Sequence, residues 1–213
     1  MLNYREYKNR TEWLNGRTAT IGASDTASIL GIGFRTSAEV WRDKTRPTGK
    51  EKKPDARIEY GQKAEEHLRA LYSLQNATEQ EILYHEFRVY VNDKYPWLSC
   101  TLDGEIVEKS TGRLGVLEIK TATIFRKEEA AEWAGRIPLK YRAQLATQLA
   151  VTEYDFAVLF AQIMHRDGRS ELVPYRYERA ELQDDIDYIL AETQEFYEKY
   201  IATGKEPPLK ITL

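Results

Sequence analysis

The 213-residue sequence contains one cysteine, Cys100, and three histidines that are far apart in the chain. A single cysteine excludes an intrachain disulfide, and a zinc centre would need more cysteine and histidine ligands than are present. No apolar run approaches the roughly 20 residues of a membrane-spanning helix. The N-terminal MLNYREYKNR also lacks the apolar core of a signal peptide. We therefore expect a cytoplasmic protein without a membrane segment.

Composition and length favour one folded domain. Apolar residues make up 42 % of the chain and charged residues 31 %, which is ordinary for a globular protein and excludes disordered and fibrous classes. A chain of this length with even composition predicts a single domain over 1–213. Its expected parts are a helical N-terminal third (1–75), a sheet core (80–177) and a C-terminal helix (180–203).

The net charge of −3 is unevenly distributed. Residues 1–57 hold 12 Lys and Arg against 7 Asp and Glu, whereas residues 171–213 hold 5 against 10. An uneven but solvated surface would explain this distribution. A basic N-terminal third would equally provide a local binding surface for phosphate groups.

The periodicity of the sequence favours an α/β fold. Helical spacing and capping residues predict helices near 5–14, 24–30, 37–44, 57–74, 126–134, 139–152 and 180–203. Alternating β-rich runs predict an antiparallel meander over 82–121 and further strands at 155–164 and 171–177. The segment 46–56 has the Pro, Gly and Lys content of an exposed loop. This order favours a central mixed sheet flanked by helices.

One predicted strand, GVLEIKTAT at 115–123, contains two opposite charges. Side chains two residues apart share a face of a strand, so Glu118 and Lys120 project together and Leu117 and Ile119 project from the other face. On a solvated face this would be an ordinary ion pair. If both faces are buried, the charges need a partner such as a metal ion or a phosphate group.

A second carboxylate is expected beside this strand. Asp103 in TLDGEI ends an apolar run at a glycine, as a simple turn aspartate also would. A hairpin between the two strands would bring Asp103 next to Glu118. Two carboxylates and a strand carbonyl are oxygen ligands of the type that Mg²⁺ prefers. Lys120 would then lie beside a metal-bound water, which is the arrangement needed for phosphodiester hydrolysis.

Two predicted helices contribute further polar groups. In IEYGQKAEEHLRALY, Glu65 borders the apolar stripe, whereas Glu66 points to water. Gly61, one turn earlier, leaves room beside Glu65. In PLKYRAQLATQLAV, Gln144 and Gln148 lie among apolar residues and need hydrogen-bond partners. A site, a DNA strand or backbone groups of the core would each supply such partners.

In this order along the chain, the motifs resemble those of the PD-(D/E)xK nuclease superfamily, and within it the bacteriophage lambda exonuclease and YqaJ-like viral recombinase family. The motifs that carry the resemblance are Arg17 with GAS at 22–24, GQKAE ending at Glu65, TLDG at 101–104, LEIK at 117–120 and the YRAQLATQ helix. Two positions depart from the family pattern: Ala146 stands where a second glutamine is common, and Leu102 stands where proline is common.

The resemblance implies a restriction-endonuclease-like α/β core and a role for each matching residue. Asp103 and Glu118 would bind Mg²⁺ with the Ile119 carbonyl, and Glu65 would support a second ion or its waters. Two Mg²⁺ ions per site are implied, with Mn²⁺ as a substitute. Lys120 would position the attacking water.

The resemblance also implies how DNA is bound. Arg17 and Ser24 would hold a 5′-phosphate, consistent with the affinity of arginine and helix N-termini for anions, although Ser24 as a plain N-cap fits equally well. Arg35 and the basic loop 42–57 would grip the duplex, with Gln144 and Gln148 as further DNA contacts.

The implied activity is a Mg²⁺-dependent 5′-to-3′ exonuclease that acts on ends of double-stranded DNA and leaves a 3′ single-stranded tail for recombination. The implied assembly is a ring-shaped homotrimer that works with a phage single-strand annealing protein in a bacterial host cell. Two alternatives stay open: an endonuclease or junction resolvase on the same fold, and a non-catalytic module that binds DNA ends.

Overall fold

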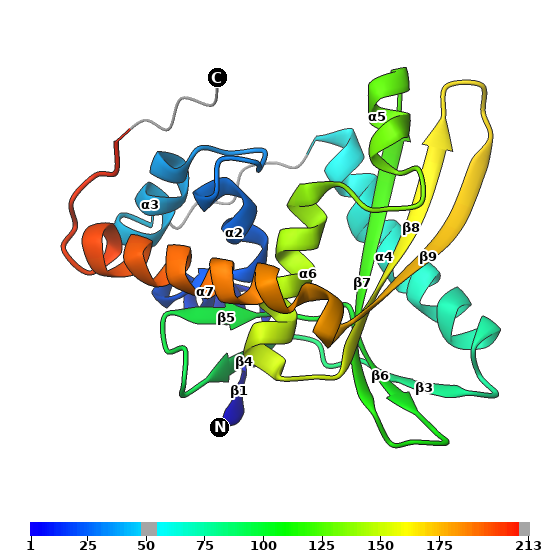
Figure 1. Ribbon diagram of the computed structural model, residues 1–213, viewed down its shortest axis with the longest axis horizontal. Helices are drawn as coiled ribbons and strands as arrows, with labels where there is room; N and C mark the ends of the chain where they lie inside the picture. The colour runs from blue at the N-terminus through cyan, green and yellow to red at the C-terminus, as the bar shows by residue number, and fades with distance from the viewer. Residues whose placement is uncertain (48–54, 209–213) are drawn as a thin grey trace.

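The computed structural model describes residues 1–47 and 55–208 of the chain (Figure 1). The helices and helical turns are α1 (Arg10–Gly16), η1 (Arg17–Ala19), α2 (Ala23–Ile29), α3 (Ser37–Thr45), α4 (Ala56–Gln75), α5 (Lys127–Glu132), α6 (Leu139–Thr152), η2 (Arg179–Leu182), α7 (Gln183–Phe196) and η3 (Tyr197–Ile201). The strands are β1 (Leu2–Glu6), β2 (Ile21–Gly22), β3 (Gln80–Leu83), β4 (Arg88–Asn92), β5 (Leu98–Cys100), β6 (Gly104–Glu108), β7 (Leu114–Ile124), β8 (Phe156–His165) and β9 (Ser170–Glu178). Most of the predicted loop over 46–56 lies outside the described residues.

The strands form two mixed sheets. One has the order β1-β4-β5-β2, in which only β2 and β5 are parallel neighbours. The other has the order β3-β6-β7-β8-β9, in which only β7 and β8 are parallel neighbours. The mixed α/β architecture flanked by helices is confirmed, with two sheets where the sequence predicted one.

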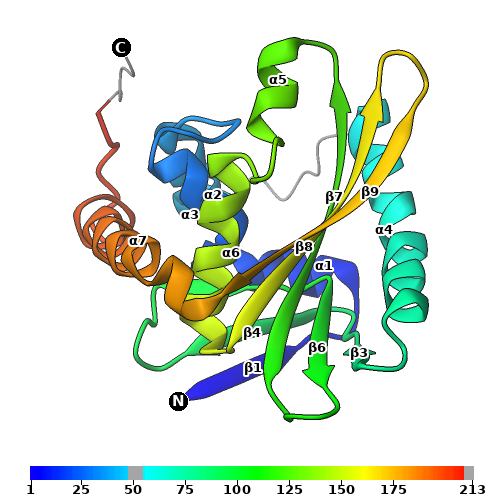
Figure 2. The same ribbon diagram turned by 45° about the vertical axis from the view of Figure 1, so that its right-hand side comes forward.

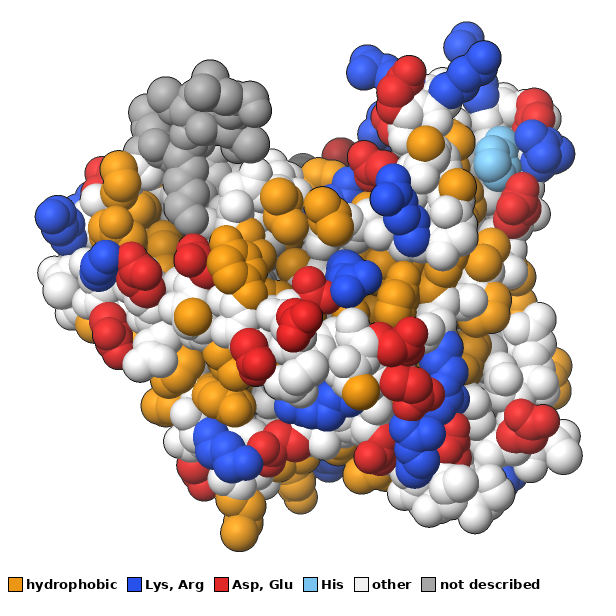
Figure 3. Space-filling view, in the orientation of Figure 1, with side chains coloured by type: hydrophobic (Ala, Val, Ile, Leu, Met, Phe, Trp, Pro, Cys, Tyr) orange, Lys and Arg blue, Asp and Glu red, His pale blue; other side chains and the backbone are white. Residues whose placement is uncertain are grey.

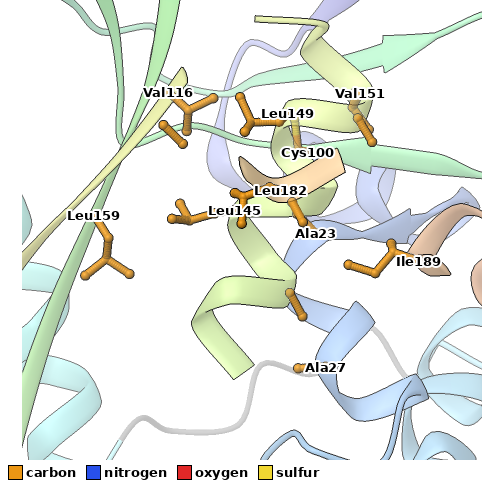
Figure 4. Packing of buried hydrophobic residues seen from close by; sticks show 14 of the residues in the cluster. Ala23, Ala27, Cys100, Val116, Leu145, Leu149, Val151, Leu159, Leu182 and Ile189 are labelled. Atoms are coloured by element: carbon orange, nitrogen blue, oxygen red, sulfur yellow. The ribbon is translucent and has the colours of Figure 1, made fainter. Parts of the chain in front are cut away.

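Helices cover both faces of the five-stranded sheet (Figure 2). On one face, Leu68 and Tyr72 of α4 pack in one buried cluster with Leu117 and Ile119 of β7. On the other face, α6 packs in the larger cluster with Val116, as Figure 4 shows for Leu145 and Leu149. Both faces of β7 are therefore covered. None of the helices among the described residues has the length and hydropathy needed to cross a membrane.

The predicted helix over 5–14 is wrong in its first half. Leu2–Glu6 is a strand that pairs with β4 in antiparallel register, from Leu2 opposite Asn92 to Glu6 opposite Arg88. The helix begins only at Arg10, after the side chain of Asn9 accepts a hydrogen bond from the Glu12 N–H at 3.0 Å. Pairing with a strand more than 80 residues away thus overrides local helical spacing.

The predicted meander over 82–121 is also wrong as a single sheet. The chain reverses after β3 at residues 84–87, where Phe87 has a positive φ of 59°. β4 and β5 then join the first sheet, and β6 returns to pair with β3. The predicted hairpin between β6 and β7 is confirmed, with Gly104 opposite Leu117.

A buried carboxylate connects the two sheets. Glu105 of β6 accepts hydrogen bonds from the hydroxyls of Tyr90 on β4 and Tyr154 after α6. Arg88 of β4 and His85 lie 3.5 and 3.2 Å from the same carboxylate. Glu105 is only 9 % exposed, so these partners compensate its desolvation.

We predict that Glu105→Ala lowers the free energy of unfolding by about 3 kcal/mol, because it leaves two buried hydroxyls without their acceptor and removes one of the two carboxylates that pair with Arg88. Urea unfolding followed by circular dichroism measures this change. Glu81→Ala on the neighbouring strand β3, where the side chain is exposed, should change stability by less than about 0.5 kcal/mol. Equal effects of the two substitutions would contradict the connecting role of Glu105.

Candidate active site

The candidate site lies where β7 extends beyond its partner β6. Pairing between the two strands ends at Gly104 and Leu117, whereas β7 continues to Ile124. Just past this end, the carboxylate of Asp103 accepts a hydrogen bond from the Ile119 N–H at 2.7 Å. The N–H and C=O groups of one strand residue point to the same side. The Ile119 carbonyl therefore also faces the side of Asp103.

Glu118 and Lys120 share the face of β7 that is covered by α6. The Glu118 side chain is buried, with 3 % exposure. Its carboxylate accepts hydrogen bonds from the Lys120 ammonium and, at 2.6 Å each, from the side-chain amides of Gln144 and Gln148. Glu118 is therefore buried, and the charged pair has further polar partners. It is not an ordinary ion pair on a solvated strand face.

Gln144 and Gln148 thus have a different partner from the DNA strand predicted for them. Gln148 also donates to the Thr101 carbonyl at 3.1 Å, which ties α6 to the segment before Asp103. Its side-chain oxygen is buried without a hydrogen-bond partner among the described residues. Both amides orient Glu118, and DNA contact by either residue stays a prediction.

Glu65 reaches the site from α4, on the opposite side of the sheet from α6. It is half-buried and its neighbour Glu66 is exposed, as the helical periodicity predicted. The close approach of α4 to β7 depends on Gly61, because a Cβ atom there would lie 3.1 Å from the Thr121 hydroxyl. The helix itself begins at Asp55, whose side chain accepts from the Arg57 and Ile58 N–H groups at 2.9 Å.

Arg69 is a site residue that the sequence did not reveal. Its guanidinium donates to the Asp103 carbonyl at 2.9 Å and contacts Glu65 at 3.4 Å. Its carbon Cζ lies 3.5 Å from the ring centroid of Tyr84. The available signal was its position one helical turn after Glu65, which places both side chains on one face. Arg69 therefore holds one carboxylate and the backbone of another in place.

Burial and neighbouring carboxylates raise the pKa of Asp103 and of Glu65. Burial, followed by the charges of Glu118 and Glu65, holds the pKa of Asp103 well above its ordinary value. Burial and Glu118 likewise raise the pKa of Glu65, although Arg69 opposes this shift. Burial alone would lower the pKa of Lys120, but Glu118 and Asp103 outweigh it and raise that pKa. Three carboxylates thus face two cations, Lys120 and Arg69, in a largely buried region.

The donors at this site fit a hard divalent cation in chemical type. Three carboxylates and a strand carbonyl are oxygen ligands, and a cation would relieve their mutual repulsion. Among residues 1–47 and 55–208, however, no group of three or more His, Cys, Asp or Glu side chains is already arranged to hold a metal ion. Part of the reason is that Glu118 is engaged by Lys120 and the two glutamines. A closed ligand shell therefore requires these side chains to reorient.

A small cavity of about 80 Å³ joins the carboxylates to the predicted phosphate-binding residues. Its lining comes from both sheets and from α2 and α6, and consists of Arg17, Gly22, Ala23, Ser24, Ser99, Cys100, Thr101, Asp103, Glu118 and Gln144. Residues from four distant parts of the sequence thus meet at one point.

Figure 3 shows that on the face in view, Lys and Arg side chains are interleaved with Asp and Glu. The charge segregation along the sequence does not produce one continuous basic surface there.

Arg17 and Ser24 both line this cavity, as the predicted phosphate site requires. The Arg17 guanidinium lies 4.4 Å from the ring centroid of Trp13 and donates to no carboxylate among the described residues. Burial lowers its pKa, and the charge of Asp25 acts in the opposite direction. Ser24 is exposed at the start of α2. An unpaired guanidinium beside a cavity is suited to an anion.

Arg35, predicted to grip DNA, has two carboxylate partners. Its guanidinium contacts Asp25 at 2.5 Å and Asp43 at 2.6 Å, so its charge is largely neutralised within the protein. In the basic loop 42–57, residues 48–54 lie outside the described residues. Lys44 points inward to Asp25 at 2.9 Å, and Arg46 lies over the ring of Trp41. DNA contact by Arg35 and by this loop stays a prediction.

Comparisons with known proteins agree with this arrangement. The model of the YqaJ-like viral recombinase domain family matches residues 12–155, which include Arg17, all the carboxylates of the site and both glutamines. The uncharacterized protein YqaJ of Bacillus subtilis (strain 168) is 25 % identical over 205 residues, which cover 94 % of this chain. The match spans only 59 % of that relative's length.

Solved structures share the fold. The alkaline exonuclease LHK-Exo of Laribacter hongkongensis superposes with a TM-score of 0.66 at 19 % identity, over 92 % of this chain and 96 % of the other. Its complex with dAMP gives a TM-score of 0.67 at 20 % identity over the same shares of the two chains. A phage-related exonuclease from Haemophilus somnus 129PT gives 0.54 at 14 % identity, over 90 % and 99 %. The restriction-endonuclease-like fold class is thereby confirmed.

We predict that Asp103→Asn stabilises the protein in the presence of a chelator. The asparagine oxygen still accepts the Ile119 N–H, but the repelling charge is gone. Because the folded-state pKa of Asp103 is raised, its ionisation opposes folding, and wild-type stability falls as the pH rises through that pKa. Asp103→Asn should therefore unfold at a higher temperature at pH 8, with a difference that shrinks as the pH is lowered.

Differential scanning calorimetry in EDTA measures this difference. Asp93→Asn, which changes an exposed aspartate, should show no such gain. A lower unfolding temperature for Asp103→Asn at pH 8 would mean that carboxylate repulsion does not dominate the site.

Proposed function

The chain belongs to the YqaJ-like viral recombinase family, and from this premise we propose that it is a metal-dependent exonuclease acting on ends of linear double-stranded DNA. The observation that supports this most is the shared cavity, which has the Arg17 guanidinium on one wall and the Asp103 and Glu118 carboxylates on another. An anion site beside a cluster of metal-type donors suits a terminal phosphate and a nearby phosphodiester bond. The whole chain 1–213 is proposed to act as one nuclease domain.

Each residue has a defined place in this proposal. Asp103, Glu118 and the Ile119 carbonyl would hold Mg²⁺, for which Mn²⁺ would substitute, and Glu65 would support a second ion directly or through water. Bound Mg²⁺ supplies a Lewis acid and a water of lowered pKa.

The surrounding side chains orient these groups. Gln144 and Gln148 hold the Glu118 carboxylate in place through their amides. Arg69 holds Glu65 and the backbone of Asp103. In the site without metal, the neighbouring carboxylates raise the pKa of Lys120 in spite of burial, which favours its protonated form. It therefore donates hydrogen bonds, and it would orient the attacking water and stabilise charge on the phosphate.

Direction and assembly are further parts of the proposal. Binding of a terminal 5′-phosphate by Arg17 and Ser24 would direct cleavage from the 5′ end, leaving a 3′ single-stranded tail for annealing. Family membership supports a phage or prophage origin, a ring-shaped homotrimer around DNA, and cooperation with a phage single-strand annealing protein in the bacterial cytoplasm. Because the match spans only 59 % of the curated relative's length, the activity, assembly and partner are proposals for this chain.

We predict that Glu65→Gln and Glu66→Gln, at adjacent positions of α4, have different effects on activity. Glu65→Gln should lower the rate of digestion of linear duplex by at least about tenfold, and Asp103→Asn by at least about 100-fold, because each removes a charge that supports the cation. Glu66→Gln should retain the wild-type rate, since its side chain is exposed. Release of acid-soluble nucleotides with 5 mM Mg²⁺, on the order of cellular levels, measures these rates. Wild-type activity in Asp103→Asn would remove the proposed site.

We further predict that digestion depends on a DNA end. On a linear duplex labelled at both ends, the 5′ label should be released first as mononucleotide, while the 3′ label stays in a single strand. Covalently closed circular duplex of the same sequence should stay intact. Cutting of the circle would favour an endonuclease or resolvase, and binding of ends without turnover would favour a non-catalytic module.

A further inference from the structure

The buried carboxylate of Asp25 holds three groups next to the phosphate cavity. Asp25 is 7 % exposed. One of its oxygens accepts from Arg35 at 2.5 Å, and the other lies 2.9 Å from the Lys44 ammonium and 3.0 Å from the Gly22 N–H. Neither the metal nor the attacking water of the proposed reaction uses this carboxylate. Its partners instead converge on the segment that carries Arg17.

Lys44 connects Asp25 back to Arg17. Its ammonium donates to the Arg17 carbonyl at 2.9 Å, and its side chain is only 10 % exposed. The segment from Arg17 to Gly22 is therefore held at both ends by one ion pair: Lys44 holds the carbonyl of its first residue, and Asp25 holds the N–H of its last. Loss of either ionic partner would remove one of the bonds that hold this segment in place, although the Arg17 N–H would still bond to the carbonyls at the end of α1.

The guanidinium of Arg17 depends on this backbone for its position. Within the described residues, it donates to no side-chain or backbone oxygen, and its contact is with the Trp13 ring at 4.4 Å. The direction of the guanidinium is thus set by its packing on Trp13 and by the backbone of the segment from Arg17 to Gly22, which Lys44 and Asp25 hold in place. Around Asp25 and Asp43, the three cations Arg17, Arg35 and Lys44 outnumber the two carboxylates by one. This local excess of positive charge suits a phosphomonoester, which carries about −1.5 to −2 charges at pH 7.

We infer that Lys44 and Arg35 are positioning residues that, through Asp25, hold Arg17 in the orientation that binds a terminal 5′-phosphate. The inference rests on the proposed function, because it concerns the same end-binding cavity. It gives Arg35 an internal role that accounts for both of its carboxylate contacts. Lys44 and Arg35 touch neither the phosphate nor the reacting atoms, so they set specificity for the DNA end through Arg17.

The test compares kcat/KM on linear duplexes that differ only in a 5′-phosphate or a 5′-hydroxyl. Arg17→Ala, which removes the phosphate-binding group, gives the lower limit of the preference for phosphate. Lys44→Met keeps the side-chain length but removes charge and donors, and should lower this preference by about tenfold, the effect of one lost charge-assisted hydrogen bond. Arg35→Met, at a side chain that is 40 % exposed, should lower it by about threefold. Lys44→Arg should retain the preference.

Lys94→Met is the matched control. Lys94 also forms one ion pair with a carboxylate, Glu153, but it is 58 % exposed and contacts no residue of the cavity. It should keep both the activity and the preference of the wild type. Thermal unfolding identifies variants that are not folded, and if Lys44→Met is one of them, Arg35→Met decides the question.

The outcomes separate two failures. If wild-type protein digests both duplexes equally, the proposed phosphate cavity is wrong, and with it the positioning role. If the wild type prefers phosphate and Arg17→Ala abolishes the preference, but folded Lys44→Met or Arg35→Met keeps it in full, the positioning role alone is overturned. A reduced preference in these variants, with Lys44→Arg and Lys94→Met unchanged, supports it.

Discussion

The candidate site depends on one interaction, the hydrogen bond from the Ile119 N–H to the Asp103 carboxylate at the end of β6. If β6 continued to pair, its backbone would occupy that edge of β7, and the Ile119 carbonyl would be used in the ladder. Ending the pairing at Gly104 instead leaves a strand edge with a donor and an acceptor. The donor fixes a carboxylate there, and the acceptor is left available to a ligand.

The carboxylates that gather at this edge are stabilised by donors from three elements, β7, α6 and α4. Glu118 is held by β7 and α6, Asp103 by β7 and Glu65 by α4. Lys120 and Arg69 offset two of the three carboxylates, but the glutamine amides and the strand N–H carry no net charge, so one negative charge is left in excess. The arrangement therefore opposes folding of the free protein, in the way that catalytic sites often do. A bound cation would attract these carboxylates, so that the site would then contribute favourably to the free energy of folding.

The sequence predicted those parts of the site that follow from local periodicity. The shared face of Glu118 and Lys120 follows from the strand period, and the contrast between Glu65 and Glu66 follows from the helical period. It did not predict β1 or the division into two sheets, because strand pairing is set by partners far along the chain. For the same reason it missed the hydrogen bond of Arg69 to the Asp103 carbonyl and the ion pairs of Arg35 with Asp25 and Asp43, since these partners leave no local pattern.

The separation into two sheets has a consequence for the chemistry at the cavity. Gly22, Ser99 and Cys100 on one wall belong to the first sheet, and Thr101 directly follows them, whereas Glu118 belongs to the second sheet. Gln148 spans both walls with one amide nitrogen, 3.1 Å from the Thr101 carbonyl and 2.6 Å from Glu118. A displacement of one sheet against the other would have to break one of these bonds. Gln148 thus fixes the spacing between the wall with the proposed phosphate site and the carboxylates. In the proposed function, this fixed spacing would select the phosphodiester bond that lies at that distance from the DNA end.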